Sequence, residues 1–388
     1  MRLISIFFIF LNLAVGSICF GQVDNPIIKN VRLFDGDSVY QSVTIKTKNG
    51  TISSISKSSN IENDEGTVID GTGYTLIPGM INAHFHTWAK KNLKEAVKSG
   101  VLGVLDMMLH PQMDFTKLKK LSQDSEYPYF YSANNPVTVP NGHGTFWKIE
   151  TLKSDELTTG FIEDRISEGA DFIKIILDHG YKNTLPTLTD NMLATTIQAS
   201  KNYSKISVAH IGSYNDAIKV AKLGVSGLAH IWIYDSIQIP EEGLQVLKAN
   251  DIFVIPTLYV YQKGVDLEGN PTNMNLLKSE VFRLYMANIP ILAGTDAPNY
   301  KLNFGSDLFE EMKLLVEAGI PELEVLKTAT SNVSKSFHLG QIGFIKVGYS
   351  ADFVLIKGNP TENIEDLYNI EGIWKQGEFI TPHNNTYE

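Results

Sequence analysis

The sequence predicts an α/β protein in which a (β/α)8 barrel carries a small β-sandwich domain. Two observations support this prediction. Between residues 80 and 340, eight apolar strand candidates alternate with helical stretches, and this rhythm is typical of a barrel of parallel strands rather than of a doubly wound sheet. Residues 22–79 and 341–388 show strand patterns instead. The chain of 388 residues, 43% of them apolar, is long enough to bury both cores.

Residues 1–21 resemble a signal peptide. Arg2 precedes a largely apolar stretch from Leu3 to Val15, and this stretch is too short to span a bilayer as a mature helix. We therefore expect cleavage near Gly21–Gln22 and export to the periplasm or to the medium, without stable membrane insertion of the mature chain. An uncleaved anchor is the alternative.

Composition narrows the classes of partner. The formal net charge of −10 argues against nucleic acid and against an anionic membrane surface. Cys19 is the only cysteine and lies in the predicted signal peptide, so the mature chain would hold no disulfide, thiolate ligand or cysteine nucleophile. A small-molecule substrate is the expected partner, and the sequence leaves a homo-oligomer open.

The terminal segments predict one small sheet. Asn49-Gly50 separates two alternating segments within residues 43–55, and this dipeptide is the strongest short signal for a β-hairpin. Strand patterns return in residues 351–356 and 371–380. We expect the two ends of the chain to complete one sandwich beside the barrel.

Polar residues recur at the ends of the barrel strand candidates, which are residues 80–86, 101–108, 129–134, 171–177, 205–210, 226–231, 252–257 and 291–296. Chemistry in such barrels lies at the carboxyl ends of the strands. Four histidines and one aspartate occupy such ends: His84, His86, His210, His230 and Asp296. A single histidine there is more often a hydrogen-bonded core residue, but five such residues together favour a metal centre. His84 and His86 lie two apart on one strand, so both imidazoles can reach one cation.

Lys174 needs a separate explanation. It lies between Ile173 and Ile175 on a strand expected to be buried, where an unpaired ammonium group is costly. One solution is a salt bridge. Another is reaction of the amine with carbon dioxide to a carbamate, whose two oxygens can bridge two cations.

Five segments resemble the successive metal-binding motifs of the amidohydrolase superfamily, in its imidazolonepropionase-like and prolidase-like branch. They are "LIPGMINAHFH", "GADFIKI", "VAHIG", "GLAHI" and "LAGTDA", and "GQIGFIKVGYSADFVLIKG" resembles the closing stretch. The resemblance covers nearly the whole mature chain. In one departure, Asn82 stands where the family usually has an aspartate two residues before the first histidine.

The resemblance implies a binuclear centre. His84, His86 and Asp296 would hold the more buried metal, His210 and His230 the other, and carboxylated Lys174 would bridge them. Imidazole ligands favour zinc for both divalent ions. A hydroxide between the two cations would be the nucleophile, and Asp296 would take its proton and pass it to the departing nitrogen.

Further histidines and one tyrosine are candidates for substrate contact. His143, between Gly142 and Gly144 after the third strand, would contact the substrate or stabilise the oxyanion, with a structural turn as the alternative. His179, Tyr259 and His110 are weaker candidates for this role. The two remaining histidines are predicted to be structural or surface residues, and they are His338 and His383.

We therefore expect an exported metal-dependent amidohydrolase that cleaves an amide-type C–N bond of a dipeptide, an N-acyl amino acid or a cyclic amide. A lactonase or a phosphoesterase would use the same hydroxide. A barrel that binds a ligand without chemistry is the other alternative, although it would not need six metal ligands. Metal analysis of the purified protein separates these classes.

Overall fold

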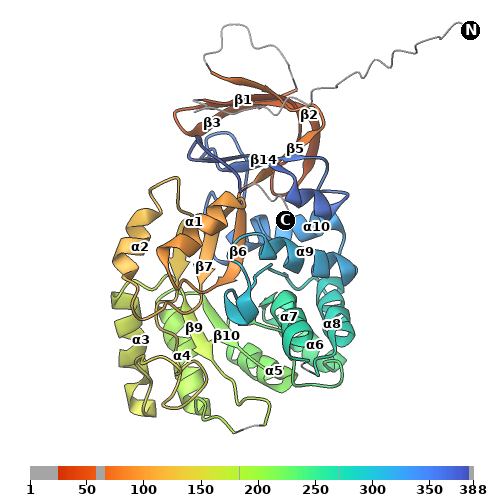
Figure 1. Ribbon diagram of the computed structural model, residues 1–388. Coiled ribbons are helices and arrows are strands. Elements are labelled where there is room, and N and C mark those ends of the chain that lie inside the picture. Colours follow the sequence, from red (N-terminus) through yellow and green to blue (C-terminus); the bar gives the residue numbers. More distant parts are fainter. Residues whose placement is uncertain (1–24, 58–65, 183, 270, 384–388) are drawn as a thin grey trace, which may run out of the picture.

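The computed structural model describes residues 25–57, 66–182, 184–269 and 271–383. The predicted signal peptide, residues 1–21 with Cys19, therefore lies outside the described residues. Two units are stacked on each other in Figure 1, with a sheet-rich unit above and a larger unit of parallel strands surrounded by helices below. Both ends of the chain contribute strands to the upper unit.

The upper unit is one eight-stranded mixed sheet in the order β15-β14-β13-β5-β1-β2-β3, with β4 paired to β1. Its strands are β1 (Ile27–Phe34), β2 (Val39–Lys48), β3 (Thr51–Ser56), β4 (Val68–Asp70), β5 (Tyr74–Pro78), β13 (Phe353–Lys357), β14 (Ile370–Lys375) and β15 (Glu378–Ile380). Antiparallel pairing of β13 with β5 joins the two ends of the chain. A separate apolar core that includes Leu76, Phe353 and Trp374 fills this unit. The arrangement is consistent with the predicted sandwich.

The predicted hairpin is confirmed. β2 and β3 pair antiparallel, with Lys48 opposite Thr51. Asn49 and Gly50 form the turn with φ angles of 51° and 75°. Positive φ at both central residues is what a two-residue turn of this twist requires, and it explains why Asn-Gly stands here.

The larger unit contains two parallel sheets, in the orders β6-β7-β8 and β12-β11-β10-β9. Their strands are β6 (Met80–Phe85), β7 (Val101–Asp106), β8 (Tyr129–Ser132), β9 (Ile173–Ile176), β10 (Ser207–His210), β11 (Gly227–Ala229) and β12 (Phe253–Ile255). Each lies within a predicted strand and is shorter than it.

The eighth predicted strand, residues 291–296, forms only a single parallel bridge, between Val254 and Ile291. Its backbone still bonds on both sides: Leu292 N donates to Val254 O at 2.9 Å, and Ala83 N donates to Ala293 O at 2.9 Å. Asp296 has a φ of 61°, which no extended strand adopts. The segment therefore leaves the strand conformation at the residue that carries its functional side chain.

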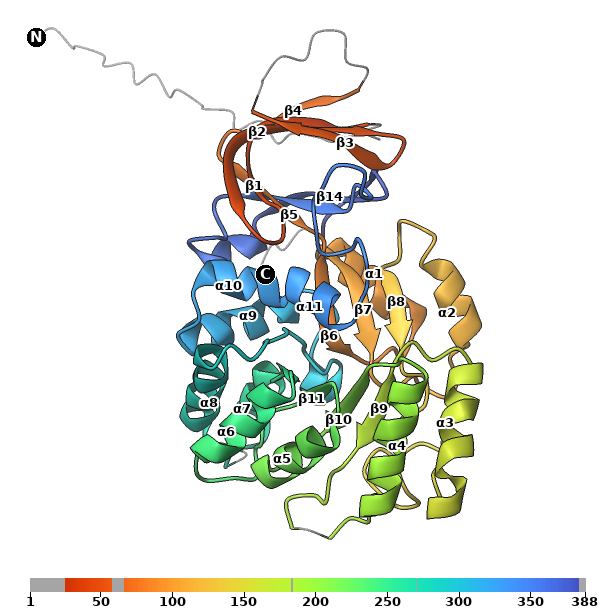
Figure 2. The same cartoon turned by 180° about the vertical axis from the view of Figure 1, so that it is seen from behind.

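Helices surround the parallel strands in both views (Figures 1 and 2). They are α1 (Lys90–Lys98), α2 (Phe115–Leu121), α3 (Thr158–Ser167), α4 (Asp190–Asn202), α5 (Tyr214–Leu223), α6 (Glu241–Ala249), α7 (Leu258–Glu268), α8 (Met274–Met286), α9 (Asp307–Glu317), α10 (Glu322–Thr328) and α11 (Ser331–Ser336). Short 3-10 turns lie at Asp155–Leu157, Asn299–Lys301 and Ile364–Tyr368. None of the described helices is both long and apolar enough to cross a membrane.

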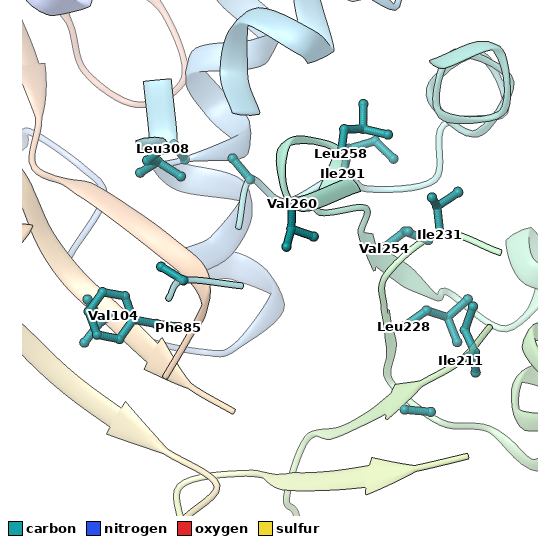
Figure 3. Packing of buried hydrophobic residues seen from close by; sticks show 14 of the residues in the cluster. Phe85, Val104, Ile211, Leu228, Ile231, Val254, Leu258, Val260, Ile291 and Leu308 are labelled. Carbon is teal, nitrogen blue, oxygen red and sulfur yellow. The ribbon is translucent and has the colours of Figure 1, made fainter. Parts of the chain in front are cut away.

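The main core lies between the strands and these helices. Figure 3 shows side chains of several strands in this layer, among them Phe85, Val104, Leu228 and Val254. Since only Gly79 separates β5 of the sheet unit from β6, the carboxyl ends of the strands face away from that unit, as the arrowheads of β7 and β8 show in Figure 2. This packed frame holds the polar strand ends together at the far end.

Candidate metal centre

His84, His86 and Asp296 meet at one point. The Nε2 atoms of His84 and His86 lie 3.1 and 2.9 Å from the same oxygen of Asp296, Oδ1. The ligand atoms of these three residues all lie within 4.8 Å of one another. The β6 strand and the segment after Ile291 thus assemble three of the six predicted ligands.

Asn82 joins the two segments that carry this trio. Its side-chain oxygen accepts hydrogen bonds from the backbone N–H groups of His84 and Thr295, at 3.1 and 3.2 Å. Its side-chain nitrogen donates to the Thr295 hydroxyl at 2.9 Å. Asn82 is completely buried, so the departure from the family pattern has a defined structural role.

The His86 ring shows why a cation fits here. Nδ1 lies 3.2 Å from the backbone oxygen of Met108, which can only accept, and Nε2 lies 2.9 Å from the Asp296 carboxylate. A neutral imidazole carries one N–H and cannot donate to both. Either His86 is protonated or a cation occupies the contact with Asp296, and neutral His with carboxylate is a common donor set for zinc.

His210 and His230 extend the cluster. The His230 ring centroid lies 4.7 Å from that of His84 and 4.3 Å from that of His210. His230 has a φ of 73°, and its Nδ1 lies 2.8 Å from the hydroxyl of Thr257. Thr257 also has a positive φ, of 50°. Such strained residues persist where surrounding contacts hold them, and they concentrate at functional sites.

A buried acid holds the first turn of the helix that follows Thr257. Thr257 stands directly before α7, and the Glu311 carboxylate of α9 accepts from the backbone N–H of Tyr259 in the first turn of α7 at 2.7 Å. Glu311 is completely buried, and its other oxygen has no hydrogen-bond partner among the described residues. Burial raises the pKa of Glu311 to about 8, against the opposing backbone hydrogen bonds.

Lys174 on β9 is 3% exposed. Its Nζ has no hydrogen-bond partner among the described residues, so the salt bridge that the sequence left open is not the solution adopted in this part of the chain. Burial lowers the pKa of Lys174 to about 7, against the opposing charge of Asp296. A group of this kind is accessible as the neutral amine near neutral pH.

Asp178 is the residue that sequence reasoning missed. It is 2% exposed; its Oδ2 lies 2.5 Å from His143 Nδ1 and 3.5 Å from His210 Nε2. Its Oδ1 accepts from the Tyr234 hydroxyl at 2.9 Å. His143, Asp178 and His210 form a second group whose ligand atoms lie within 4.8 Å of one another.

The pKa values of three of the four histidines favour the neutral form that binds a cation. Burial lowers the pKa of His84 to about 3 and that of His210 to about 4, and it lowers that of His230 well below its usual value. For His86, burial works to lower the pKa, but Asp296 outweighs it and the pKa is raised. Burial works to raise the pKa of Asp296, but His84 and His86 outweigh it and hold that pKa well below its usual range. Neutral imidazoles beside an ionised carboxylate are what a cation requires.

The weaker candidates lie near the rim. His179 is half-buried, with its Nε2 4.0 Å from Asp216. Tyr259 joins the network through its backbone, whereas the ring of the half-buried Tyr261 lies 6.0 Å from that of His230. His110 stacks in an aromatic group described below. His338 lines a small cavity with Phe337, and exposed His383 bonds through its backbone to Lys98 O, so neither belongs to the cluster.

Comparison with known proteins identifies relatives over most of the chain. The profile of the amidohydrolase family matches residues 75–382. A 5'-deoxyadenosine deaminase from Methanococcus maripaludis is 26% identical over 382 residues, covering 84% of this chain and 85% of the relative. Ochratoxinase from Aspergillus niger is 23% identical over 238 residues, covering 56% of this chain and 47% of that protein.

Solved structures share the fold at low identity. A Xaa-Pro dipeptidase with bound methionine superposes with a TM-score of 0.80 at 20% identity, covering 92% of this chain and 99% of that one. A putative prolidase from Bifidobacterium longum superposes with a TM-score of 0.78 at 22% identity, covering 94% of this chain and 97% of that one.

Proposed function

Because the chain belongs to the amidohydrolase family and is a metal-dependent hydrolase of carbon–nitrogen bonds, we propose that it cleaves an amide-type C–N bond of a small molecule. A dipeptide, an N-acyl amino acid or a cyclic amide is the substrate class. The observation that carries this proposal is the convergence of His84 and His86 on one oxygen of Asp296, together with the unpartnered amine of Lys174, which is buried on β9.

The frame of the site is proposed to be a closed (β/α)8 barrel. Two links support closure. Val137 bridges in parallel to Ile175 of β9, which connects the two parallel sheets. The segment after Pro290 bonds to β12 on one side and to β6 on the other. The proposed domains are residues 22–79 with 341–388 for the sandwich and residues 80–340 for the barrel.

Two divalent cations, zinc in this proposal, would be held at this end of the barrel. His84, His86 and Asp296 would hold one, and His210 and His230 the other. Lys174 would bridge them as a carbamate: its neutral amine forms an N–C bond to carbon dioxide and loses one proton, which leaves an anionic group with two oxygens. The buried environment of Nζ supports this, since no other group among the described residues satisfies it.

Bound cations would lower the pKa of a water molecule toward neutrality and polarise the substrate carbonyl. The other steps belong to the protein. Asp296 is ionised and accepts the proton of the attacking water, then returns it to the departing nitrogen. His143, held through Nδ1 by Asp178, presents Nε2 to the carbonyl oxygen of the substrate. The Thr257 hydroxyl, which contacts Nδ1 of His230, would fix the orientation of this metal ligand.

Deamination is the second candidate, because a deaminase of an adenosine derivative aligns over 84% of this chain. Both reactions hydrolyse a C–N bond, but they release different products. The zinc-loaded protein should be incubated with dipeptides, N-acyl amino acids, cyclic amides and 5'-deoxyadenosine. Free amino acid without ammonia supports the proposal; ammonia from the nucleoside alone contradicts it in favour of deamination.

Export and association are proposals as well. Export rests on residues 1–21 alone, and sequencing the N-terminus of the protein from the periplasm or the medium tests it. The expected sequence begins near Gln22, and an N-terminus at Met1 contradicts cleavage. The charge of −10 argues against nucleic acid and anionic membranes, so we propose a small-molecule substrate as the partner, and a homo-oligomer stays open.

A further inference from the structure

Four aromatic side chains form a continuous group beside the candidate centre, and we call it the aromatic platform: Trp88, His110, Phe146 and Trp147. The Trp147 ring is its middle. Its centroid lies 5.4 Å from Trp88, 4.5 Å from His110 and 4.7 Å from Phe146, and all three contacts are edge-to-face. Such geometry is favoured between aromatic rings. The group is thus a packed assembly of side chains from three different loops.

The same loops also carry residues of the candidate metal centre or residues in contact with it. Trp88 follows His86 by two residues, and His110 follows Met108, whose carbonyl contacts His86. Phe146 and Trp147 follow His143 on one loop. That loop packs closely on the strand ends, because a Cβ added to Gly144 would lie 2.8 Å from Ile176 Cδ1 and 3.8 Å from Met108 Sδ. The loops that carry the platform therefore also carry His86 of one candidate ligand group and His143 of the other.

The backbone holds the platform in place. On β6 and its loop, Thr87 N donates to buried Asp106 at 2.7 Å, and Ala89 N donates to Asn92 at 2.7 Å. Trp88 stands between these two bonds. On the next loop, Gln112 N donates to Nδ1 of His110 at 3.2 Å, which fixes that ring. A surface fixed in advance loses little entropy when a ligand binds.

The platform is open to solvent although it is apolar. Phe146 is 70% exposed and Trp88 is 45% exposed. The two other rings are half-buried and support them. Adjacent exposed aromatic rings are unusual on a soluble surface and mark a place where another apolar group binds. Beside a site that receives small molecules, that group is part of the substrate.

We propose that the aromatic platform binds an aromatic ring of the substrate, so that the enzyme prefers amides that carry an aryl group near the scissile bond. This inference rests on the proposed function, since it names the substrate class of the same site. Edge-to-face contact with Trp147 and Phe146 would orient the ring, while the polar part of the molecule reaches His143 and the strand ends.

One cavity is the alternative binding place for an aryl group. It measures about 430 Å³ and is lined by Tyr181, Tyr234, Asp235 and Asn273 among others. Its two tyrosine rings lie 5.8 Å apart. Asp235 and Asn273 share its wall, whereas the platform consists of three Trp and Phe rings and one imidazole, so the platform is the better site for an aryl group.

Binding can be tested apart from turnover. The zinc-loaded protein is titrated calorimetrically with phenylacetate and, as a matched ligand without the ring, with acetate. We expect tighter binding of phenylacetate, and Trp147→Leu and Phe146→Leu should each weaken it by roughly three- to tenfold, the usual range for one aromatic contact. Acetate binding should not change. Tyr40→Leu, an exposed aromatic residue on β2 of the sheet unit, is the control and should change neither.

Three results would overturn the inference: equal binding of phenylacetate and acetate by the unaltered protein, no effect of either platform variant, or loss of phenylacetate binding in Tyr181→Leu instead. Thermal unfolding of every variant shows that it is folded.

A kinetic experiment tests the same inference. With N-acetyl-phenylalanine as the substrate, the Trp147→Leu variant should show a raised KM with little change in kcat. Binding without any amide hydrolysis would contradict the proposed function and leave the platform supported.

Discussion

The two halves of the candidate centre differ in how completely the protein assembles them. In the first half, His84, His86 and Asp296 already converge, and Asn82 ties their backbones together. In the second half, His210 and His230 lie in ring contact, but the amine of Lys174 beside them has no partner among the described residues. The first half is complete in its side chains, whereas the second would, on our proposal, be completed by a carbamate on Lys174.

Lys174→Ala is expected to have the largest effect. Without a bridging group the second half should lose its cation, and turnover should fall below detection. Lys174→Glu supplies a shorter carboxylate and should retain more metal. Because Nζ has no partner to lose, the metal-free alanine variant should be at least as stable as the metal-free parent. Elemental analysis and thermal unfolding measure these effects.

Small carboxylic acids added to Lys174→Ala can fill the position of the lost bridging group. We expect them to restore metal content and activity in part, and together. Full metal content and normal turnover in the alanine variant would show that the two halves do not depend on Lys174. The two halves would then not differ in the way proposed here.

Asp296→Asn tests the first half. The amide can still fill the space but cannot accept the proton, so turnover should fall by roughly 10²–10⁴, with a smaller fall in metal content. Asp171→Asn, at the amino-terminal end of the strands where Asp171 pairs with Lys119, is the matched control and should keep its activity. Near-normal turnover in metal-loaded Asp296→Asn would exclude the proton-transfer role.

Asp178→Asn sharpens the comparison within the second half. The change removes the charge that holds His143 and His210, and loss of such a partner typically lowers metal affinity by roughly 10–100-fold. Only the second of two metal-binding steps should weaken in a titration against a competing chelator. Tyr234→Phe removes one hydrogen bond to the same carboxylate and should weaken that step less. Equal weakening of both steps would contradict the assignment.

Glu311→Gln is expected to have the smallest effect, and it concerns stability. The raised pKa of Glu311, about 8, means that the folded protein binds a proton that the unfolded chain releases above about pH 4.5. The free energy of unfolding therefore falls between these pH values, by at most about 1.4 kcal/mol per pH unit from this group. The glutamine variant should lack this part of the slope. Urea unfolding at several pH values measures this dependence. If the free energy of unfolding changed equally with pH in both proteins, Glu311 would not be protonated in the folded state.

Local sequence patterns predicted those site residues whose position is set by a single strand. His84 and His86 follow from the two-residue period of β6, and Lys174 from the apolar residues beside it. The same local reasoning extended the eighth strand to residue 296, because nothing in the apolar run shows that Asp296 turns to a positive φ. Gly294, against the backbone of His84, marks that close contact only once the structure is known.

Residues whose role depends on distant partners escaped prediction. Asp178 lies one residue beyond a predicted strand, and a carboxylate at that position was a signal that could have been used. Its importance comes from His143, His210 and Tyr234, which are far from it in sequence. Glu311 resembles one more charged residue of an amphipathic helix, and only the packing of α9 against α7 shows that it is buried.

The central claim is a binuclear centre bridged by a modified Lys174, and anomalous diffraction from crystals of the zinc-loaded protein tests it most directly. We expect two peaks at the zinc edge, one beside His84, His86 and Asp296 and the other beside His210 and His230. Electron density should continue from Lys174 Nζ to both. A single peak at the first position, with an unmodified amine at Lys174, would contradict the account.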